Sequence, residues 1–180
     1  MIDLVITEEM KEKAREYSSL AIESLTKQGK INYTGLDTDD RYYYGNLGER
    51  IFLELLKAQG KKATYKSKAD GNSDKGDFIV FGQITGQPKV VDIKTASKSF
   101  HTRIMLPELQ WAKADYDYYI GIKLNGDVGE VWGYCKKKDF EVENNGFNEQ
   151  QAPTRYKYLN DLGSIEKFLT LIKDGEVVEK

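Results

Sequence analysis

The first part of the chain carries apolar residues at helical spacing. These residues are Met10, Ala14, Tyr17, Ala21 and Leu25. They lie on one face of a helix that we expect over residues 7–28. Thr7 suits the N-cap of this helix, since its hydroxyl can accept a backbone N–H and acids follow it. The same spacing predicts a second helix from about Asn46 to Gln59, which Gly60 ends.

Two strand patterns in the middle of the chain predict an antiparallel hairpin. They cover residues 77–83 and 88–95, and a short turn that contains glycine separates them. Pro107 fits the first turn of a helix that ends near Ala114. Further strands are expected at 61–66, 116–124 and 128–134, a C-terminal helix at 164–173, and loops at 30–44, 67–76 and 144–154.

This order of elements predicts an α/β protein with a central mixed β-sheet flanked by helices. A chain of 180 residues suits a single domain with a full core. We expect residues 1–180 to form that domain, with the core at 45–124, the N-terminal helix at 7–28 and a strand-and-helix extension at 125–180.

Composition removes several classes of site. Cys135 is the only cysteine, which excludes an intrachain disulfide and argues against a cysteine zinc site. His101 is the only histidine, which argues against histidine-rich metal sites and HNH-type nuclease chemistry. The net charge of −2 means that a nucleic acid would have to meet a local basic patch. No apolar run is long enough to span a membrane and no basic leader is visible, so a cytoplasmic location is expected.

The strand at 88–95 carries candidate chemistry. Because side chains alternate along a strand, Asp92 and Lys94 point to one side, and Val91 and Ile93 point to the other. An acid beside an ammonium in a cleft can hold a metal ion and polarise a water. The same pair can also be an ordinary ion pair that faces solvent.

Two more acids extend this pattern. Glu49 lies on the apolar face of the second helix, near its N-terminal end, with Arg50 on the polar side. A carboxylate there needs a cation, a donor or exposure, although the helix dipole also stabilises acids in a first turn. Asp77 opens the strand that precedes the one with Asp92. It is a common turn residue, but the hairpin could bring Asp77 and Asp92 to the same end of the sheet.

Glu49, Asp77, Asp92 and Lys94 together suit metal-dependent hydrolysis. Mg²⁺ typically takes one or two carboxylates, waters and phosphate oxygens, and it activates water against a phosphodiester. Lys94 could orient or help deprotonate that water, and the Ile93 carbonyl could be a further ligand. The alternative is that the four charged residues form scattered surface ion pairs.

The order of these residues resembles the core signature of the PD-(D/E)XK nuclease superfamily. The matching positions are Gly48-Glu49, Gly76-Asp77 and Asp92-Ile93-Lys94. The resemblance implies a restriction-endonuclease-like fold in which Asp77 and Asp92 bind metal, Glu49 assists and Lys94 is catalytic. Gly76 replaces the proline of the signature. Gln110 stands where some members begin a Gln-x-x-x-Tyr motif, but Ala114 replaces its tyrosine.

The resemblance implies a deoxyribonuclease that uses Mg²⁺, with Mn²⁺ as a substitute metal and DNA as the partner. We expect an endonuclease, which would need a homodimer to cut both strands. One alternative is a recombination or repair nuclease, such as a junction resolvase or an exonuclease. Another is a nucleic-acid-binding protein of the same fold without catalysis.

A basic, hydroxyl-rich segment follows Lys94, at residues 95–103. Lys98, His101 and Arg103 are candidate phosphate contacts, and Gln110 is a candidate contact to the site or to the nucleic acid. The alternative is a solvated loop with a surface histidine.

Overall fold

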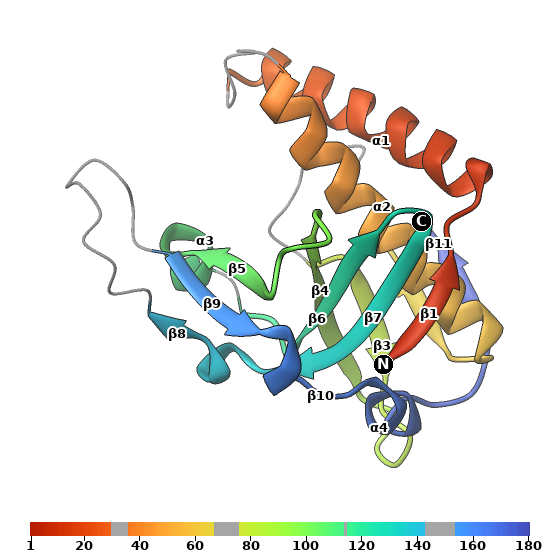
Figure 1. The fold of residues 1–180 in the computed structure, drawn as a ribbon. Coiled ribbons are helices and arrows are strands. Elements are labelled where there is room, and N and C mark those ends of the chain that lie inside the picture. The colour runs from red at the N-terminus through yellow and green to blue at the C-terminus, as the bar shows by residue number, and fades with distance from the viewer. Residues whose placement is uncertain (30–35, 67–75, 114, 143–153) are drawn as a thin grey trace.

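Figure 1 shows the computed structural model of the protein, which describes residues 1–29, 36–66, 76–113, 115–142 and 154–180. A mixed sheet forms its centre, and a smaller sheet lies beside it. In spatial order, the main sheet contains β1 (Ile2–Val5), β7 (Val128–Cys135), β6 (Tyr118–Asn125), β4 (Pro88–Ala96), β3 (Phe78–Phe81), β2 (Ala63–Tyr65) and β11 (Val177–Glu179), with β10 (Gly163–Ser164) paired to β7. The second sheet contains β5 (Arg103–Pro107), β9 (Thr154–Tyr158) and β8 (Glu141–Val142).

The helices flank these sheets. In the described part of the chain, the α-helices are α1 (Glu8–Lys27), α2 (Leu36–Ala58), α3 (Glu108–Lys113) and α4 (Ile165–Thr170), and short 3₁₀ turns lie at Lys137–Asp139 and Leu159–Asp161. In Figure 1, α1 lies along α2, and α2 lies against the main sheet. α4 packs against β7, and α3 directly follows β5. The expectation of an α/β protein with a mixed sheet and flanking helices is confirmed at the level of fold class.

The direction of the main sheet changes at β4. This strand is antiparallel to β3, with Val91 opposite Phe78, so the predicted hairpin is confirmed. It is parallel to β6, with Asp92 beside Tyr119. β4 therefore has hydrogen-bonded neighbours on both edges.

The two faces of the main sheet belong to two separate apolar cores. Val91, Ile93 and Ile120 point to the core that α2 and α4 cover. Tyr119, next to Ile120 along β6, belongs to the other core, which Ile104 of β5 also joins. Alternation along the strands therefore assigns each side chain near Asp92 to one face or the other.

The second helix begins earlier than predicted. It starts at Leu36 and not near Asn46, so the loop expected at 30–44 is wrong from residue 36 onward. Aspartate, tyrosine and glycine in this stretch are poor helix formers, but tertiary packing outweighs weak propensity. Asn46 Nδ2 contributes to that packing by donating to Ser18 Oγ of α1 at 3.2 Å.

Several strands and one helix end also differ from the predictions. Pro107 ends β5 and does not enter a helix, and α4 ends at Thr170, before the predicted residue 173. The sequence pattern did not indicate β1, β5, β8, β9, β10 or β11. These strands are short, and most of them have partners that are distant in the chain; β11, for example, pairs with β2. Residues 125–180 supply β7, β10 and β11 to the main sheet.

The loops predicted at 67–76 and 144–154 lie almost entirely outside the described residues. Within the described ranges, no helix is long and apolar enough to cross a membrane.

Candidate active site

Asp92 and Lys94 form the centre of the candidate site, in the middle of the main sheet. Lys94 Nζ lies 2.7 Å from Asp92 Oδ2. The side chains are 14% and 1% exposed respectively, so this is a buried ion pair and not a pair that faces solvent. The prediction that both side chains leave β4 on one side is confirmed.

Asp77 joins this centre from the adjacent strand. Its backbone N–H donates to the Val91 carbonyl at 2.9 Å. Its carboxylate Oδ2 accepts the backbone N–H of Ile93 at 2.6 Å. The two contacts bracket Asp92 along β4, and both Asp77 and Asp92 are 0% exposed. Asp77 therefore lies beside the stretch of β4 that carries Asp92.

Gly76 fixes the entry of the chain into this position. Its φ is +69°, in the left-handed region, and an added Cβ would clash with the Val90 side chain. Proline cannot adopt this conformation, because its ring holds φ near −65°. The backbone conformation at Gly76 thus explains why this position is not the proline of the signature that the sequence resembles.

Glu49 approaches from the helical side of the sheet. It is 5% exposed, and its Oε2 accepts a hydrogen bond from the Tyr65 hydroxyl at 3.0 Å. Because α2 begins at Leu36, Glu49 lies in the helix interior, and a first-turn dipole effect is wrong as its explanation. α2 comes close to β4 at Gly48, where an added Cβ would clash with Thr95 Oγ1.

The Tyr65 hydroxyl interacts electrostatically with both Glu49 and Asp77. Burial raises the pKa of its hydroxyl far above the ordinary value, and the negative charges of Glu49 and Asp77 raise it further. The hydroxyl therefore stays protonated and remains a donor to Glu49. A second tyrosine, Tyr119, lies beside Asp92, and burial and the Asp92 charge raise its pKa in the same way.

Oxygen ligands for a cation are present, but the acids do not all converge. No group of three or more His, Cys, Asp or Glu side chains in the described ranges could hold a metal ion. Asp77 and Asp92 lie together, whereas Glu49 contacts Tyr65 on the α2 side. The N–H and C=O of one strand residue point to the same neighbouring strand, so the Ile93 carbonyl faces the side of the Asp77 carboxylate. Two carboxylates and a carbonyl fit Mg²⁺, which usually keeps several waters.

Lys94 also contacts the next helix. Its Nζ lies 3.3 Å from Oε1 of Gln110 on α3. Gln110 was predicted to contact either the site or the nucleic acid. In the structure it contacts Lys94 of the site.

Lys94 lines a cleft of about 570 Å³ together with much of the predicted basic segment. Other lining residues include Phe100, His101, Arg103 and Tyr158. Burial, Lys98 and Lys123 together lower the pKa of His101, so its ring is mostly neutral near pH 7. The segment is not one continuous loop, because β4 extends to Ala96 and β5 begins at Arg103.

Lys98 lies in a second hollow that borders this cleft. Ser97 lines both, and Lys98 Nζ lies 5.9 Å from the centre of the Tyr44 ring. The structure therefore separates the candidate phosphate contacts into His101 and Arg103 beside Lys94, and Lys98 beside α2.

Sequence reasoning missed Tyr65 and misplaced Arg50. Arg50 was expected on the polar side of its helix, but it is 3% exposed. Its guanidinium lies over the rings of Tyr17 and Tyr65 and pairs with Glu179 Oε2 at 2.9 Å. The earlier start of α2 and the pairing of β11 with β2 create this enclosure, and neither leaves a local sequence signal.

Comparisons with known proteins give no family for this chain. No protein-family model matches it, and no curated protein sequence matches it. The functional assignment therefore depends on the geometry of the site and on the order of its residues.

Proposed function

We propose that this protein is a Mg²⁺-dependent deoxyribonuclease with a restriction-endonuclease-like fold of the PD-(D/E)XK type. One observation carries the proposal. Asp77 bonds to the strand of Asp92 and Lys94, and these two residues form a buried ion pair. Burying acids in this way is costly unless they are paired or hold a cation. The central strand β4 carries Asp92 and Lys94 beside a cleft lined by basic side chains. A catalytic role explains the burial of these charges better than a contribution to stability does.

Asp77, Asp92 and the Ile93 carbonyl are the groups that would hold the metal. When bound, Mg²⁺ supplies an activated water and stabilises negative charge on the phosphodiester. Glu49 takes a supporting role, with its Oε2 held by the Tyr65 hydroxyl at 3.0 Å.

Lys94 positions the attacking water and neutralises developing negative charge. An ammonium has three donors, and Asp92 and Gln110 accept two of them, so one donor can point to the water or to a phosphate oxygen. His101 and Arg103 line the same cleft and are placed to donate to neighbouring phosphates. DNA enters this cleft, and the cut bond lies next to Lys94.

The test uses plain duplex, nicked, flapped and four-way DNA with Mg²⁺ or Mn²⁺. We expect the wild type to cut at least one substrate, and Asp92→Asn and Lys94→Ala to reduce the rate at least a hundredfold. Lys89→Ala is the matched control, because Lys89 lies on the same strand and pairs with Asp117 at 2.8 Å. No cutting by the wild type on any substrate, or equal cutting by Asp92→Asn, would overturn the proposal.

A further inference from the structure

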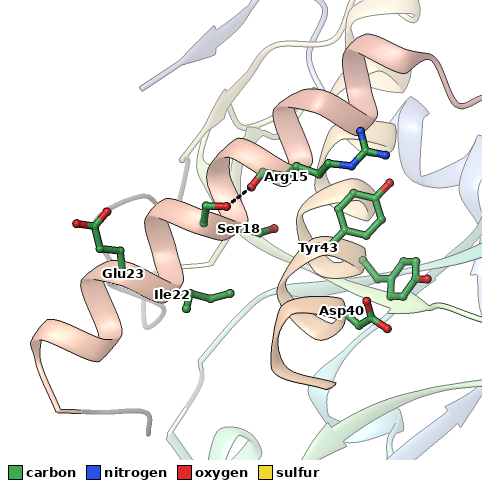
Figure 2. Close-up of a pocket in the computed structure, with 8 residues that line it drawn as sticks. Arg15, Ser18, Ile22, Glu23, Asp40 and Tyr43 are labelled. Carbon is green, nitrogen blue, oxygen red and sulfur yellow. Dashed lines mark hydrogen bonds between the residues drawn. The ribbon is translucent and has the colours of Figure 1, made fainter. Parts of the chain in front are cut away.

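Three hollows adjoin one another through shared lining residues. The first is the cleft at Lys94, and the second borders it at Ser97. The second is also lined by Tyr43 and Tyr44, which line the third hollow between α1 and α2 as well. Figure 2 shows this third hollow, with a volume of about 640 Å³.

Two tyrosines and two cations meet where the second and third hollows join. The rings of Tyr43 and Tyr44 have centres 5.2 Å apart. The Arg15 guanidinium lies 5.6 Å from the Tyr43 ring, and Lys98 Nζ lies 5.9 Å from the Tyr44 ring. Figure 2 shows Arg15 of α1 extending toward Tyr43 of α2. Both tyrosines pack partly against the core, but they also line the open hollows.

We propose that Tyr43 and Tyr44, with Arg15 and Lys98, bind unpaired bases of a single-stranded nucleic-acid segment that continues from the Lys94 cleft. This inference rests on the proposed function, because the proposed nuclease cleft at Lys94 is the place from which the nucleic acid continues toward the tyrosines. Aromatic rings with nearby cations are the usual platform for unpaired bases, and these two half-buried rings line open hollows. Duplex DNA keeps its bases stacked on each other and cannot use such rings.

The charges in the hollows determine where the bases and the phosphates of the bound nucleic acid lie. Lys11 lines the second hollow, but Glu8 and Asp127 each accept from it at 2.8 Å, so its charge is already neutralised. Among the described residues of the second hollow, Lys98 is therefore the cation left to meet a phosphate, while Arg15 lies over the Tyr43 ring in the third hollow. Glu23 and Asp40 line the third hollow and would repel phosphate there. The bases, and not the backbone, enter this hollow.

The experiment measures binding of fluorescent oligothymidine and oligouridine without metal, so that no cutting occurs. We expect each of Tyr43→Leu and Tyr44→Leu to weaken binding roughly tenfold, as the loss of one base stack predicts. Tyr43→Phe and Tyr44→Phe keep the ring and should keep binding within about twofold. Arg15→Ala should weaken binding, because it removes the cation that lies over the Tyr43 ring. Lys13→Ala is its control, because Lys13 is on the same helix and pairs with Glu9 at 2.9 Å.

The outcomes separate this inference from the proposed nuclease activity. If the Leu variants, shown to be folded by their melting temperatures, bind both oligonucleotides as well as the wild type, the inference fails even if DNA is cut. If the wild type binds them through the tyrosines but never cuts DNA, the nuclease proposal fails and the binding site stands. Tighter binding of one oligonucleotide tells whether the segment is DNA or RNA.

Discussion

Asp77 and Ile93 are joined by a hydrogen bond of 2.6 Å from the Ile93 backbone N–H to the Asp77 carboxylate. This side chain occupies the place along β4 where the pairing with β3 has ended. One carboxylate therefore has two tasks: it completes the backbone bonding of the strand, and it lies next to Asp92.

These two tasks can be separated by substitution. Asp77→Ala leaves the buried Ile93 N–H without its acceptor, and we expect the free energy of unfolding to fall by about 1–3 kcal/mol. Asp77→Asn keeps an acceptor and should lose less than about 1 kcal/mol, yet both variants should lose DNA cleavage. Urea unfolding followed by circular dichroism measures the first quantity. Equal destabilisation by the two variants would show that the hydrogen bond is unimportant.

The Asp92–Lys94 pair should show strong coupling. Lys94→Met leaves a buried carboxylate without its cation, which typically costs about 3–5 kcal/mol. The double variant Asp92→Asn/Lys94→Met removes both charges and should be more stable than Lys94→Met alone. The control cycle uses Lys89 and Asp117, a half-exposed pair whose coupling should stay below about 1 kcal/mol. Additive effects of Asp92→Asn and Lys94→Met would contradict the buried ion pair.

Mg²⁺ should stabilise the folded protein through the aspartates. At a hundred times its Kd, a bound metal raises the free energy of unfolding by about 2.7 kcal/mol. We expect Mg²⁺ to raise the Tm of the wild type and of Glu49→Gln, because Glu49 accepts from the Tyr65 hydroxyl and the described side chains include no metal-holding group of three acids. Asp77→Asn and Asp92→Asn should respond weakly, and a chelator should reverse the effect. A shift that persists in the Asp77→Asn/Asp92→Asn double variant would place the metal elsewhere.

Stability should fall at alkaline pH because of Cys135. Burial raises the pKa of its thiol from the ordinary 9.0 to about 12. The folded state therefore keeps a proton that the unfolded state loses, and this contribution is fully present below pH 9. Above pH 9 the free energy of unfolding should fall by up to about 1.4 kcal/mol per pH unit. Cys135→Ala should flatten the slope between pH 9 and 10, because the tyrosines that also ionise there are the same in both proteins and contribute equally to the two slopes. Equal slopes would show that the thiol is accessible in the folded state.

Arg50 should matter more for stability than its acidic partner. Arg50→Ala removes the guanidinium from between two tyrosine rings, and we expect a loss of more than about 2 kcal/mol. Glu179 is 38% exposed in its side chain, so Glu179→Ala should cost less than about 1 kcal/mol. Thermal and urea unfolding compare the two variants. A larger effect for Glu179→Ala would mean that the ion pair, and not the ring contacts, holds Arg50.

The parts of the site that local pattern determines could be predicted. Alternation places Asp92 and Lys94 on the same side of a strand, and the turn between β3 and β4 brings Asp77 near them. Thr7 caps α1 by accepting the backbone N–H of Met10 at 3.2 Å, as its position before the acids indicates.

The parts that depend on distant contacts could not be predicted. α2 begins at Leu36, well before the stretch with clear helical periodicity, so Glu49 was assigned to a first turn that does not exist. Arg50 was assigned to the polar face because helical periodicity gives no sign of Tyr17 or of β11. The second sheet needs β5 to pair with β9, with Arg103 opposite Tyr158, and a pairing between such distant residues has no local signature.

The position of β4 has a consequence for how this protein can vary. Pro88–Val91 pair with β3, Val91–Ala96 pair with β6, and the Asp77 side chain accepts the Ile93 N–H, so the bonded amide protons in the middle of β4 should exchange slowly with solvent. The backbone that carries the residues that we propose for chemistry is therefore held by the main sheet. Differences in substrate preference between proteins with this sheet must therefore arise in the segments around the cleft, where the backbone can change while the sheet stays intact.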